Sequence, residues 1–308
     1  MSETLIGLLH PGEMGAAVAG CLTGRGYQVL WVPAGRSPAT AARAAAAGLT
    51  AAAAGPDAAG QAADLARRAG IILSICPPHG ALEVARAVAA AGFTGVFVDA
   101  NAISPGTAEQ VRAIAGAAGA RYVDGGIIGL PPPPVPGPEA SPGGTRLYLA
   151  AGPEGGDGGG PAAQVAALFE GTPLTPEILR NENRTAASAL KMAYASWTKG
   201  SAALLLAARA LARAEGVQDS LLAEWSLSQP GLGGRSLGAA RSAAAKGWRW
   251  VGEMEEIAAS MTSGGLPGGF HQAAAEVFRR SSLEAAEAGG PDDALIGAVL
   301  ATLLPGSS

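Results

Sequence analysis

The chain has 308 residues, a formal net charge of −4 and 48% hydrophobic residues, with 46 glycines and 22 prolines. This hydrophobic content excludes a disordered chain, and the absence of a basic run argues against a nucleic-acid-binding protein. We expect a cytoplasmic protein with no membrane attachment, because no apolar run is long enough to span a bilayer and no secretory signal is visible. Cys21 and Cys76 have no histidine at metal-ligand spacing, so we expect neither a metal site nor a disulfide.

The first half of the sequence alternates short β-like runs with alanine-rich helical runs. The predicted strands are residues 5–9, 27–32, 71–75, 96–99, 121–124 and 145–150, and the predicted helices are residues 16–24, 39–47, 58–68, 81–91 and 107–118. This rhythm is typical of βαβ units and predicts a parallel sheet buried between helices. A ligand crevice is then expected at the carboxyl ends of the strands.

The second half is predicted to be helical. After Asn183, apolar residues recur every three or four positions and predict one helix of roughly 30 residues that buries this stripe. The stripe consists of Leu190, Ala193, Trp197, Gly200, Leu204, Ala207 and Leu211. Further helices are predicted at residues 220–228, 237–245, 251–261, 269–288 and 291–304, separated by glycine-rich breaks.

The first predicted strand runs into the segment His10-Pro11-Gly12-Glu13-Met14-Gly15. A dinucleotide-binding turn needs a tight bend, close backbone approach to a pyrophosphate and close helix packing, with the phosphates at the helix N-terminus. Gly12 and Gly15 meet the second and third needs, whereas His10 replaces the first glycine of the G-x-G-x-x-G pattern. The segment therefore indicates either a dinucleotide site or an ordinary strand-to-helix turn.

The end of the second predicted strand favours NADP over NAD. NAD-selective sites place an acidic residue here for the ribose 2′-hydroxyl, but residues 31–38 contain no acid. Arg36 can pair with a 2′-phosphate through two hydrogen bonds, and Ser37 can donate another. The alternative is an arginine in a solvated loop.

Five segments in order resemble the β-hydroxyacid dehydrogenase superfamily, which includes 6-phosphogluconate dehydrogenase and the imine reductases. They are residues 11–15, 35–38, 98–105, 122–126 and the helix that contains Lys191. Residues 248–255 and 268–271 resemble a poorly characterised 6-phosphogluconate dehydrogenase-like group. The resemblance implies an α/β Rossmann NADP-binding domain over residues 1–180 and a long interdomain helix. It also implies an all-α C-terminal domain over residues 181–308 that forms a homodimer and contributes to the substrate pocket.

The resemblance also implies site residues. The expected NADP(H) contacts are His10, Pro11, Gly12, Glu13, Met14, Gly15, Arg36, Ser37, Pro77 and Asn101. Family members transfer a hydride between the nicotinamide and a carbonyl or imine carbon. Asn101 falls in the segment near the nicotinamide end; the alternative is an asparagine that closes a turn after a strand.

Lys191 matches the lysine that the dehydrogenases use as a general acid/base. Only three lysines occur in the chain, so a chance match at this position is improbable. A solvated helix lysine is the alternative. The family's asparagine four residues later is Ala195 here, and Tyr194, one helical turn from Lys191, can replace it as a donor or can simply pack.

The substrate side departs from the family pattern. Ile128 stands where many members have a serine, followed by Gly129, so we expect a more apolar pocket and not a typical small 3-hydroxy acid. Trp197, Glu253 and His271 are further candidates for substrate binding. Packing of the tryptophan and a surface position for the histidine are the alternatives, and Glu253 would favour a cationic or imine-like substrate if it faced the pocket.

Three functions remain open from the sequence. The first is an NADP(H)-dependent dehydrogenase or reductase acting on a small molecule with a carbonyl/alcohol carbon. The second is an imine reductase, suggested by the loss of the serine and asparagine positions. The third is a non-catalytic NADP-binding sensor or scaffold, suggested by the same departures.

Overall fold

The computed structural model describes residues 4–53, 57–133, 144–150, 152, 160–281 and 292–304. The chain divides into two compact units, Met1–Lys191 and Met192–Ser308. Helix α7 (Ala186–Ala214) begins in the first unit and continues into the second. The predicted fold class, an α/β Rossmann domain followed by a long helix and a helical domain, is confirmed.

Within the described residues, the strands of the first unit form one sheet in the order β3-β2-β1-β4-β5-β6-β7-β8. All neighbours are parallel except β6 and β7, which are antiparallel. The strands are β1 (Ile6–Leu8), β2 (Val29–Trp31), β3 (Thr50–Ala51), β4 (Ile71–Ser74), β5 (Val96–Asp99), β6 (Arg121–Ile128), β7 (Thr145–Ala150) and β8 (Leu174–Leu179). Strands β1, β4 and β5 are buried along their whole length, as expected where helices cover both faces of a sheet.

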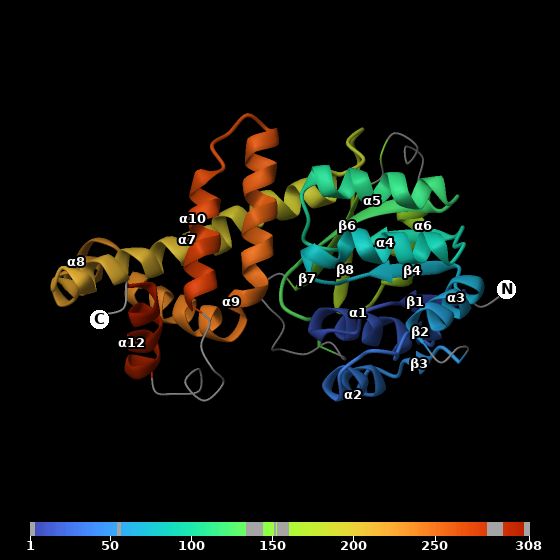
Figure 1. Ribbon diagram of the computed structural model, residues 1–308, viewed down its shortest axis with the longest axis horizontal. Helices are drawn as coiled ribbons and strands as arrows, with labels where there is room; N and C mark the ends of the chain where they lie inside the picture. Colours follow the sequence, from blue (N-terminus) through green and yellow to red (C-terminus); the bar gives the residue numbers. More distant parts are fainter. Residues whose placement is uncertain are drawn as a thin grey trace. The chain divides into compact units, whose positions relative to one another are not determined.

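Helices cover both faces of this sheet, and Figure 1 shows α4 and α5 side by side over it. One face packs against α1 (Glu13–Thr23) and α6 (Pro161–Leu168), and the other against α3 (Ala58–Arg68), α4 (Ala81–Ala90) and α5 (Pro105–Ala117). Helix α2 (Pro38–Ala46) contacts α1. Ser37, Asp57 and Ser104 accept hydrogen bonds from the backbone N–H three residues later and so fix where three of these helices begin.

The described part of the second unit is helical. It contains the rest of α7, α8 (Gln218–Ser228), α9 (Leu232–Ser263), α10 (Gly269–Ser281) and α12 (Asp292–Leu303). Helices α9 and α10 lie side by side, and α12 packs against both (Figure 1). None of the described helices is both long enough and apolar enough to cross a lipid bilayer.

One helix prediction in this unit needs correction. The predicted break between residues 245 and 251 is wrong, because α9 continues through Gly247, which is buried. One helical glycine costs only about 1 kcal/mol relative to alanine, and packing against α10 outweighs that cost. Residues 282–288 and Pro291, also predicted to be helical, lie outside the described residues.

The apolar stripe on α7 is only partly buried within the single chain, where Gly200 is buried. Trp197, Leu204 and Leu211 are 69%, 55% and 63% exposed. The face that α7 buries is formed instead by small or flexible residues, namely Met192, Ala195, Ala203, Leu206 and Ala210. Small side chains allow neighbouring helices to approach closely, so the larger side chains of α7 are left on the outer face.

Candidate functional site

The turn from β1 to α1 has the close packing that a dinucleotide site needs. A Cβ atom at position 15 would lie 2.4 Å from the backbone oxygen of His10, so only glycine fits there. Gly12 is the N-cap residue of α1, and open space surrounds the position that its Cβ would occupy. Because Gly12 has no side chain, it makes no cap bond to this helix, and the N–H groups of the first turn are placed to bind phosphate oxygens.

Two nitrogen atoms near this turn are buried without partners. Among the described residues, neither Nδ1 of His10 nor Nε of Arg36 has a hydrogen-bond partner. Burial, and then the charge of Arg36, lower the pKa of His10 to about 4. Arg36 therefore lies close to His10 and is half-buried rather than fully solvated. An anionic group would satisfy both side chains, as the NADP prediction requires.

The loop that carries Arg36 is held in place by hydrogen bonds. The backbone N–H of Ala34 donates to Oε1 of Gln61 on α3 at 2.9 Å, and the N–H of Arg36 donates to the carbonyl of Pro33 at 3.1 Å. Gly35 has φ +73°, a value that favours glycine. The arginine is therefore presented by an ordered turn before any ligand arrives.

Other residues predicted to contact the cofactor form hydrogen bonds or packing contacts within the protein near this turn. The hydroxyl of Ser37 already accepts from the backbone N–H of Thr40 at 3.3 Å as the cap of α2. The carbonyl of Pro11 accepts from Nε of Arg43 at 3.4 Å, and Met14 packs against the core. Glu13 opens α1, and Pro77 is exposed in the loop after β4.

Asn101 is buried and bridges two strand ends. Its Oδ1 accepts from the backbone N–H of Cys76 at 2.6 Å, and its Nδ2 donates to Oγ of Ser74 at 3.0 Å. Its own backbone N–H donates to Oδ1 of Asp99 at 2.9 Å. These bonds favour the strand-end role that the sequence left open.

A row of buried polar side chains crosses three parallel strands, at the carboxyl ends of β4 and β5 and in the middle of β6. Ser74 on β4 pairs in register with Asp99 on β5, which pairs with Asp124 on β6. Each of the three is at most 1% exposed. We call Ser74, Asp99 and Asp124 the polar row; it holds Asn101 at one end.

The polar row contains two carboxyl groups and no cation. Burial raises the pKa of Asp99 to about 7, and the neighbouring Asp124 acts in the same direction. Burial likewise raises the pKa of Asp124 to about 6. Tyr122 remains a neutral phenol, because burial raises its pKa well above the ordinary value. Since Oδ2 of Asp99 has no hydrogen-bond partner among the described residues, Asp99 is the group that retains a proton near neutral pH.

The other end of the polar row holds the first turn of α7. Asp124 accepts from the backbone N–H of Ser188 at 2.9 Å and from its hydroxyl at 2.5 Å. A Cβ at position 126 would lie 2.7 Å from the carbonyl oxygen of Ala187, so glycine there lets the helix approach β6. One turn later, Nζ of Lys191 donates to the carbonyl of Ile127 at 2.7 Å. The predicted acid/base is thus tied to the sheet and is not a freely solvated lysine.

The predicted substrate residues of the first unit lie at the end of β6. Ile128 is 3% exposed. Gly129 has φ +130°, and a Cβ there would lie 2.9 Å from Cα of Thr145, so the turn from β6 toward β7 requires glycine. Ile128 thus supplies an apolar wall and no hydrogen-bond donor.

Glu253 on α9 forms an ion pair with Lys199 on α7. Both side chains are mostly buried, and the ammonium of Lys199 also lies 5.5 Å from the ring centre of Trp250. The charge of Glu253 is therefore compensated within its own unit. Lys199 was missed by sequence analysis, because a pair 54 residues apart in the chain has no local signal.

The remaining candidates differ in exposure. The surface interpretation of His271 is wrong: it is 6% exposed, and its Nε2 lies 3.4 Å from the carbonyl oxygen of Ser196. Its Nδ1 has no hydrogen-bond partner in the part of the chain that the structure describes. Tyr194 and Trp197 are 46% and 69% exposed, so neither packs inside the single chain.

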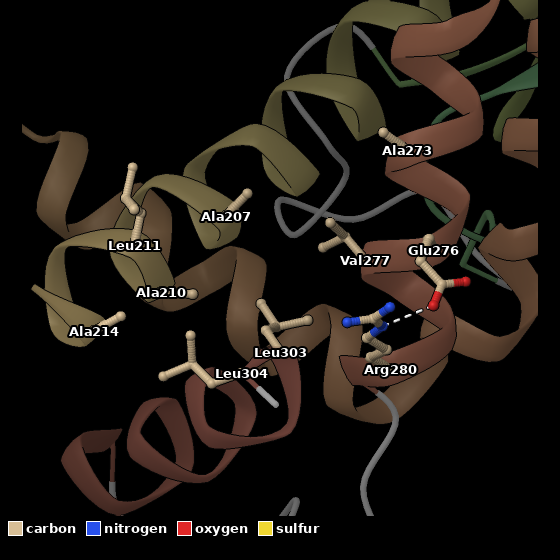
Figure 2. Close-up of a pocket in the computed structure, with 10 residues that line it drawn as sticks. All are labelled: Ala207, Ala210, Leu211, Ala214, Ala273, Glu276, Val277, Arg280, Leu303 and Leu304. Carbon is tan, nitrogen blue, oxygen red and sulfur yellow. Dashed lines mark hydrogen bonds and ion pairs between the residues drawn. The ribbon is translucent and has the colours of Figure 1, made fainter. Parts of the chain in front are cut away.

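A separate apolar pocket of about 380 Å³ lies within the second unit. It is lined by α7, α10 and the end of α12, and Figure 2 shows the ion pair between Glu276 and Arg280 at its edge. None of the predicted site residues lines it. Leu211 of the exposed stripe does, so the apolar surface of α7 extends into this pocket.

Two family models match the chain. Residues 4–150 match the NAD binding domain of 6-phosphogluconate dehydrogenase, and residues 212–281 match a domain of unknown function (DUF1932). No curated protein matches the sequence significantly. The first match assigns a nicotinamide dinucleotide to the unit that contains the β1–α1 turn.

Solved structures share the fold over almost the whole chain. A conserved hypothetical protein from Sinorhizobium meliloti 1021 is 23% identical, covers 97% of both chains and has a TM-score of 0.63. Mycobacterium tuberculosis 3-hydroxyisobutyrate dehydrogenase with L-serine is 19% identical, with 90% and 92% coverage and a TM-score of 0.60. A reductive aminase from Aspergillus terreus with NADPH4, cyclohexanone and allyl amine is 20% identical, with 91% and 93% coverage and a TM-score of 0.52.

The raised pKa values of the polar row predict how stability depends on pH. Both carboxyls have folded-state pKa values above the unfolded value of about 4, so their contribution is complete below about pH 4 and is lost as pH rises to about 7. Asp99→Asn removes one ionising group, so the free energy of unfolding should fall less steeply with pH, by up to about 1.4 kcal/mol per pH unit.

Urea unfolding between pH 4 and pH 8 measures this slope. Asp219→Asn, at an exposed position in the first turn of α8, should retain the slope of the unaltered chain. An Asp99→Asn variant with an unchanged slope would contradict a buried proton in the polar row.

Proposed function

We propose that this member of the β-hydroxyacid dehydrogenase-like superfamily is a cytoplasmic NADP(H)-dependent oxidoreductase acting on a carbonyl/alcohol carbon of a small molecule. The two family-model matches and the fold shared over at least 90% of the chain support its place in the superfamily. They also support a nicotinamide-dinucleotide-dependent oxidoreductase. We further propose the preference for NADP(H), the reacting group and the residue roles.

The observation that carries the NADP proposal is the set of groups around Arg36. Its Nε is buried without a partner among the described residues, and no acidic residue follows β2 to bind a ribose 2′-hydroxyl. A planar guanidinium matches a phosphate with two parallel hydrogen bonds. The ordered loop around Gly35 limits the entropy lost when these bonds form.

Lys191 supplies the acid/base group in this proposal. An ammonium has three N–H donors, and the bond to the carbonyl of Ile127 fixes the direction of one. The bound dinucleotide supplies or accepts the hydride. Lys191 stabilises the developing alkoxide and protonates it during reduction, and its neutral amine accepts the hydroxyl proton during oxidation.

Side chains of each unit, taken separately, favour a carbonyl over a cationic imine. Ile127 and Ile128 are apolar and buried, so they offer no side-chain donor for a carboxylate. Glu253 does not act as an isolated anion, because Lys199 neutralises it. We therefore infer a substrate that is more apolar than a small 3-hydroxy acid. A screen of aldehydes, ketones, hydroxy acids and cyclic imines with NADPH separates this proposal from imine reduction.

A homodimer is the second part of the proposal. Trp197, Leu204 and Leu211 repeat every seven residues on the exposed face of α7, and α8 has no buried residue at all. Large apolar side chains at this spacing form the seam along which helices pair. A second copy of the chain covers this face, because the stripe continues into the apolar pocket at Leu211.

Removing the guanidinium of Arg36 should change cofactor preference. Arg36→Ala should weaken NADPH binding about 10- to 100-fold, because a charge-assisted bond is lost, and should change NADH binding less than threefold. Calorimetric titration measures both affinities. Arg86→Ala, at an exposed position on α4, is the control and should change neither. Equal losses for NADPH and NADH would refute the 2′-phosphate role.

Removing the ammonium of Lys191 should abolish turnover but not cofactor binding. Lys191→Ala should lower kcat at least 100-fold on the best substrate from the screen, while the Kd for NADPH changes less than threefold. Lys246→Ala, at an exposed position on α9, should behave like the unaltered chain. Unchanged turnover in Lys191→Ala would exclude this lysine from the chemistry, and an unaltered chain that binds NADPH without turning over any substrate would favour the sensor or scaffold.

A charge on the exposed face of α7 should separate the subunits. We expect the unaltered chain to sediment as a dimer at micromolar concentration and Leu204→Glu to weaken the dimer at least tenfold, because a carboxylate would be buried against apolar side chains. Leu266→Glu is the control, because Leu266 is similarly exposed at 58% but lies outside the stripe. A monomeric unaltered chain would overturn the dimer.

A further inference from the structure

We infer that His10 is a second recognition group for the 2′-phosphate of NADP(H) and that it takes up one proton when this phosphate binds between it and Arg36. The inference deepens the proposed function and rests on the proposed use of NADP(H). It assigns a function to His10, which replaces the first glycine of the dinucleotide-binding pattern.

His10 occupies the position of a turn glycine without strain. No described residue other than glycine has a positive φ, so the backbone at His10 does not need a glycine. The backbone remains tight, since the N–H of Gly12 donates to the carbonyl of His10 at 2.9 Å and Gly15 packs against the same oxygen. A glycine here would leave space beside the turn, and the imidazole fills part of it.

The imidazole is placed beside a cation and has no anion to balance it. Burial is the main cause of its lowered pKa, and Arg36 is the neighbouring charge that adds to it. Nδ1 of His10 and Nε of Arg36 both lack partners among the described residues. Two nitrogen atoms that favour an anion are therefore buried together, at a cost that no described side chain offsets.

The groups that shift the pKa values of His10 and Arg36 include no carboxylate, and Glu13 at the start of α1 is not among them. The thiol of Cys76 faces Arg36, but burial raises its pKa to about 12, so it is neutral. Glu83 on α4 acts on Cys76 and not on His10. Arg43 on α2 donates to the backbone of the turn and adds a further positive charge. The pair is thus completed by a ligand anion.

A phosphate dianion beside both groups changes the protonation of His10. The negative charge offsets the repulsion from Arg36 and favours the imidazolium, which can then donate to a phosphate oxygen. One proton moves from the buffer to the imidazole, and no other bond is made or broken. NAD carries a neutral 2′-hydroxyl at this position, which can form a hydrogen bond but cannot hold an imidazolium.

The source of the anion can be distinguished, because NADP and NAD share the pyrophosphate and differ in the 2′-phosphate. Proton uptake with NADP⁺ alone assigns His10 to the 2′-phosphate, whereas equal uptake with both dinucleotides assigns it to the pyrophosphate and overturns the inference. Because the bound form holds the extra proton, NADP⁺ should bind more tightly as pH falls from 8 to 6.5.

Calorimetric titration of the full chain at pH 7 in Pipes and in Tris measures the proton count, since these buffers differ in ionisation enthalpy. We expect net proton uptake with NADP⁺ and none with NAD⁺. His10→Asn should abolish the uptake and weaken NADP⁺ binding about tenfold, while NAD⁺ binding changes less than threefold. His79→Asn, at an exposed position in the short helix after β4, should leave all three quantities unchanged.

His10→Gly provides a second variant, because glycine is the residue that such turns ordinarily carry, and it should give the same result if His10→Asn does not fold. NADP⁺ preference that depends on Arg36 but shows neither proton uptake nor loss in either His10 variant overturns this inference alone. An unaltered chain that binds no dinucleotide overturns the proposed function and this inference together.

Discussion

The burial of two carboxyl groups without a cation is the constraint on which the candidate site depends. Asp99 and Asp124 are neighbours in register on β5 and β6. Asp124 accepts two hydrogen bonds from Ser188, whereas Asp99 accepts one from the backbone N–H of Asn101 at Oδ1. One carboxyl holds the segment of Asn101 and the other holds the first turn of α7. The positions of Asn101 and of the lysine helix are therefore coupled through adjacent residues of the sheet.

At β1 and β2 the situation is reversed, because basic side chains lie there without an anion among the described residues. There the groups that follow the strands are His10 and Arg36, and no described anion balances them. Since β2, β1, β4, β5 and β6 are neighbours in this order, the sheet changes along one direction from nitrogen groups without a described partner to buried carboxyl groups. A dinucleotide has the matching polarity, with phosphates toward one end and an uncharged or singly charged nicotinamide ring at the other.

Local patterns in the sequence predict the frame of this site but not its internal contacts. The predicted bounds of β5, β7 and α3 coincide with those observed, because apolar runs and caps mark their ends. Strand β3 consists of only two residues, both exposed, and α6 follows a glycine-rich segment, so neither gives a periodic signal.

The bonds between Ser188 and Asp124 and between Glu253 and Lys199 join distant segments, and only the fold brings them together. Ser74 is a site residue that the sequence analysis missed although a signal for it exists, because it is a polar residue at the end of an apolar strand. The stripe on α7 was identified correctly, but periodicity does not say whether the same chain or a second copy covers it.

The central claim is that the turn after β1 and the loop after β2 together recognise a phosphorylated adenosine ribose. Calorimetric titration of the unaltered chain with NADPH and with NADH, at one neutral pH and one ionic strength, tests it most directly. The account predicts that NADPH binds at least about tenfold more tightly, as expected for one additional charge-assisted contact. Equal affinity, or tighter binding of NADH, would contradict it.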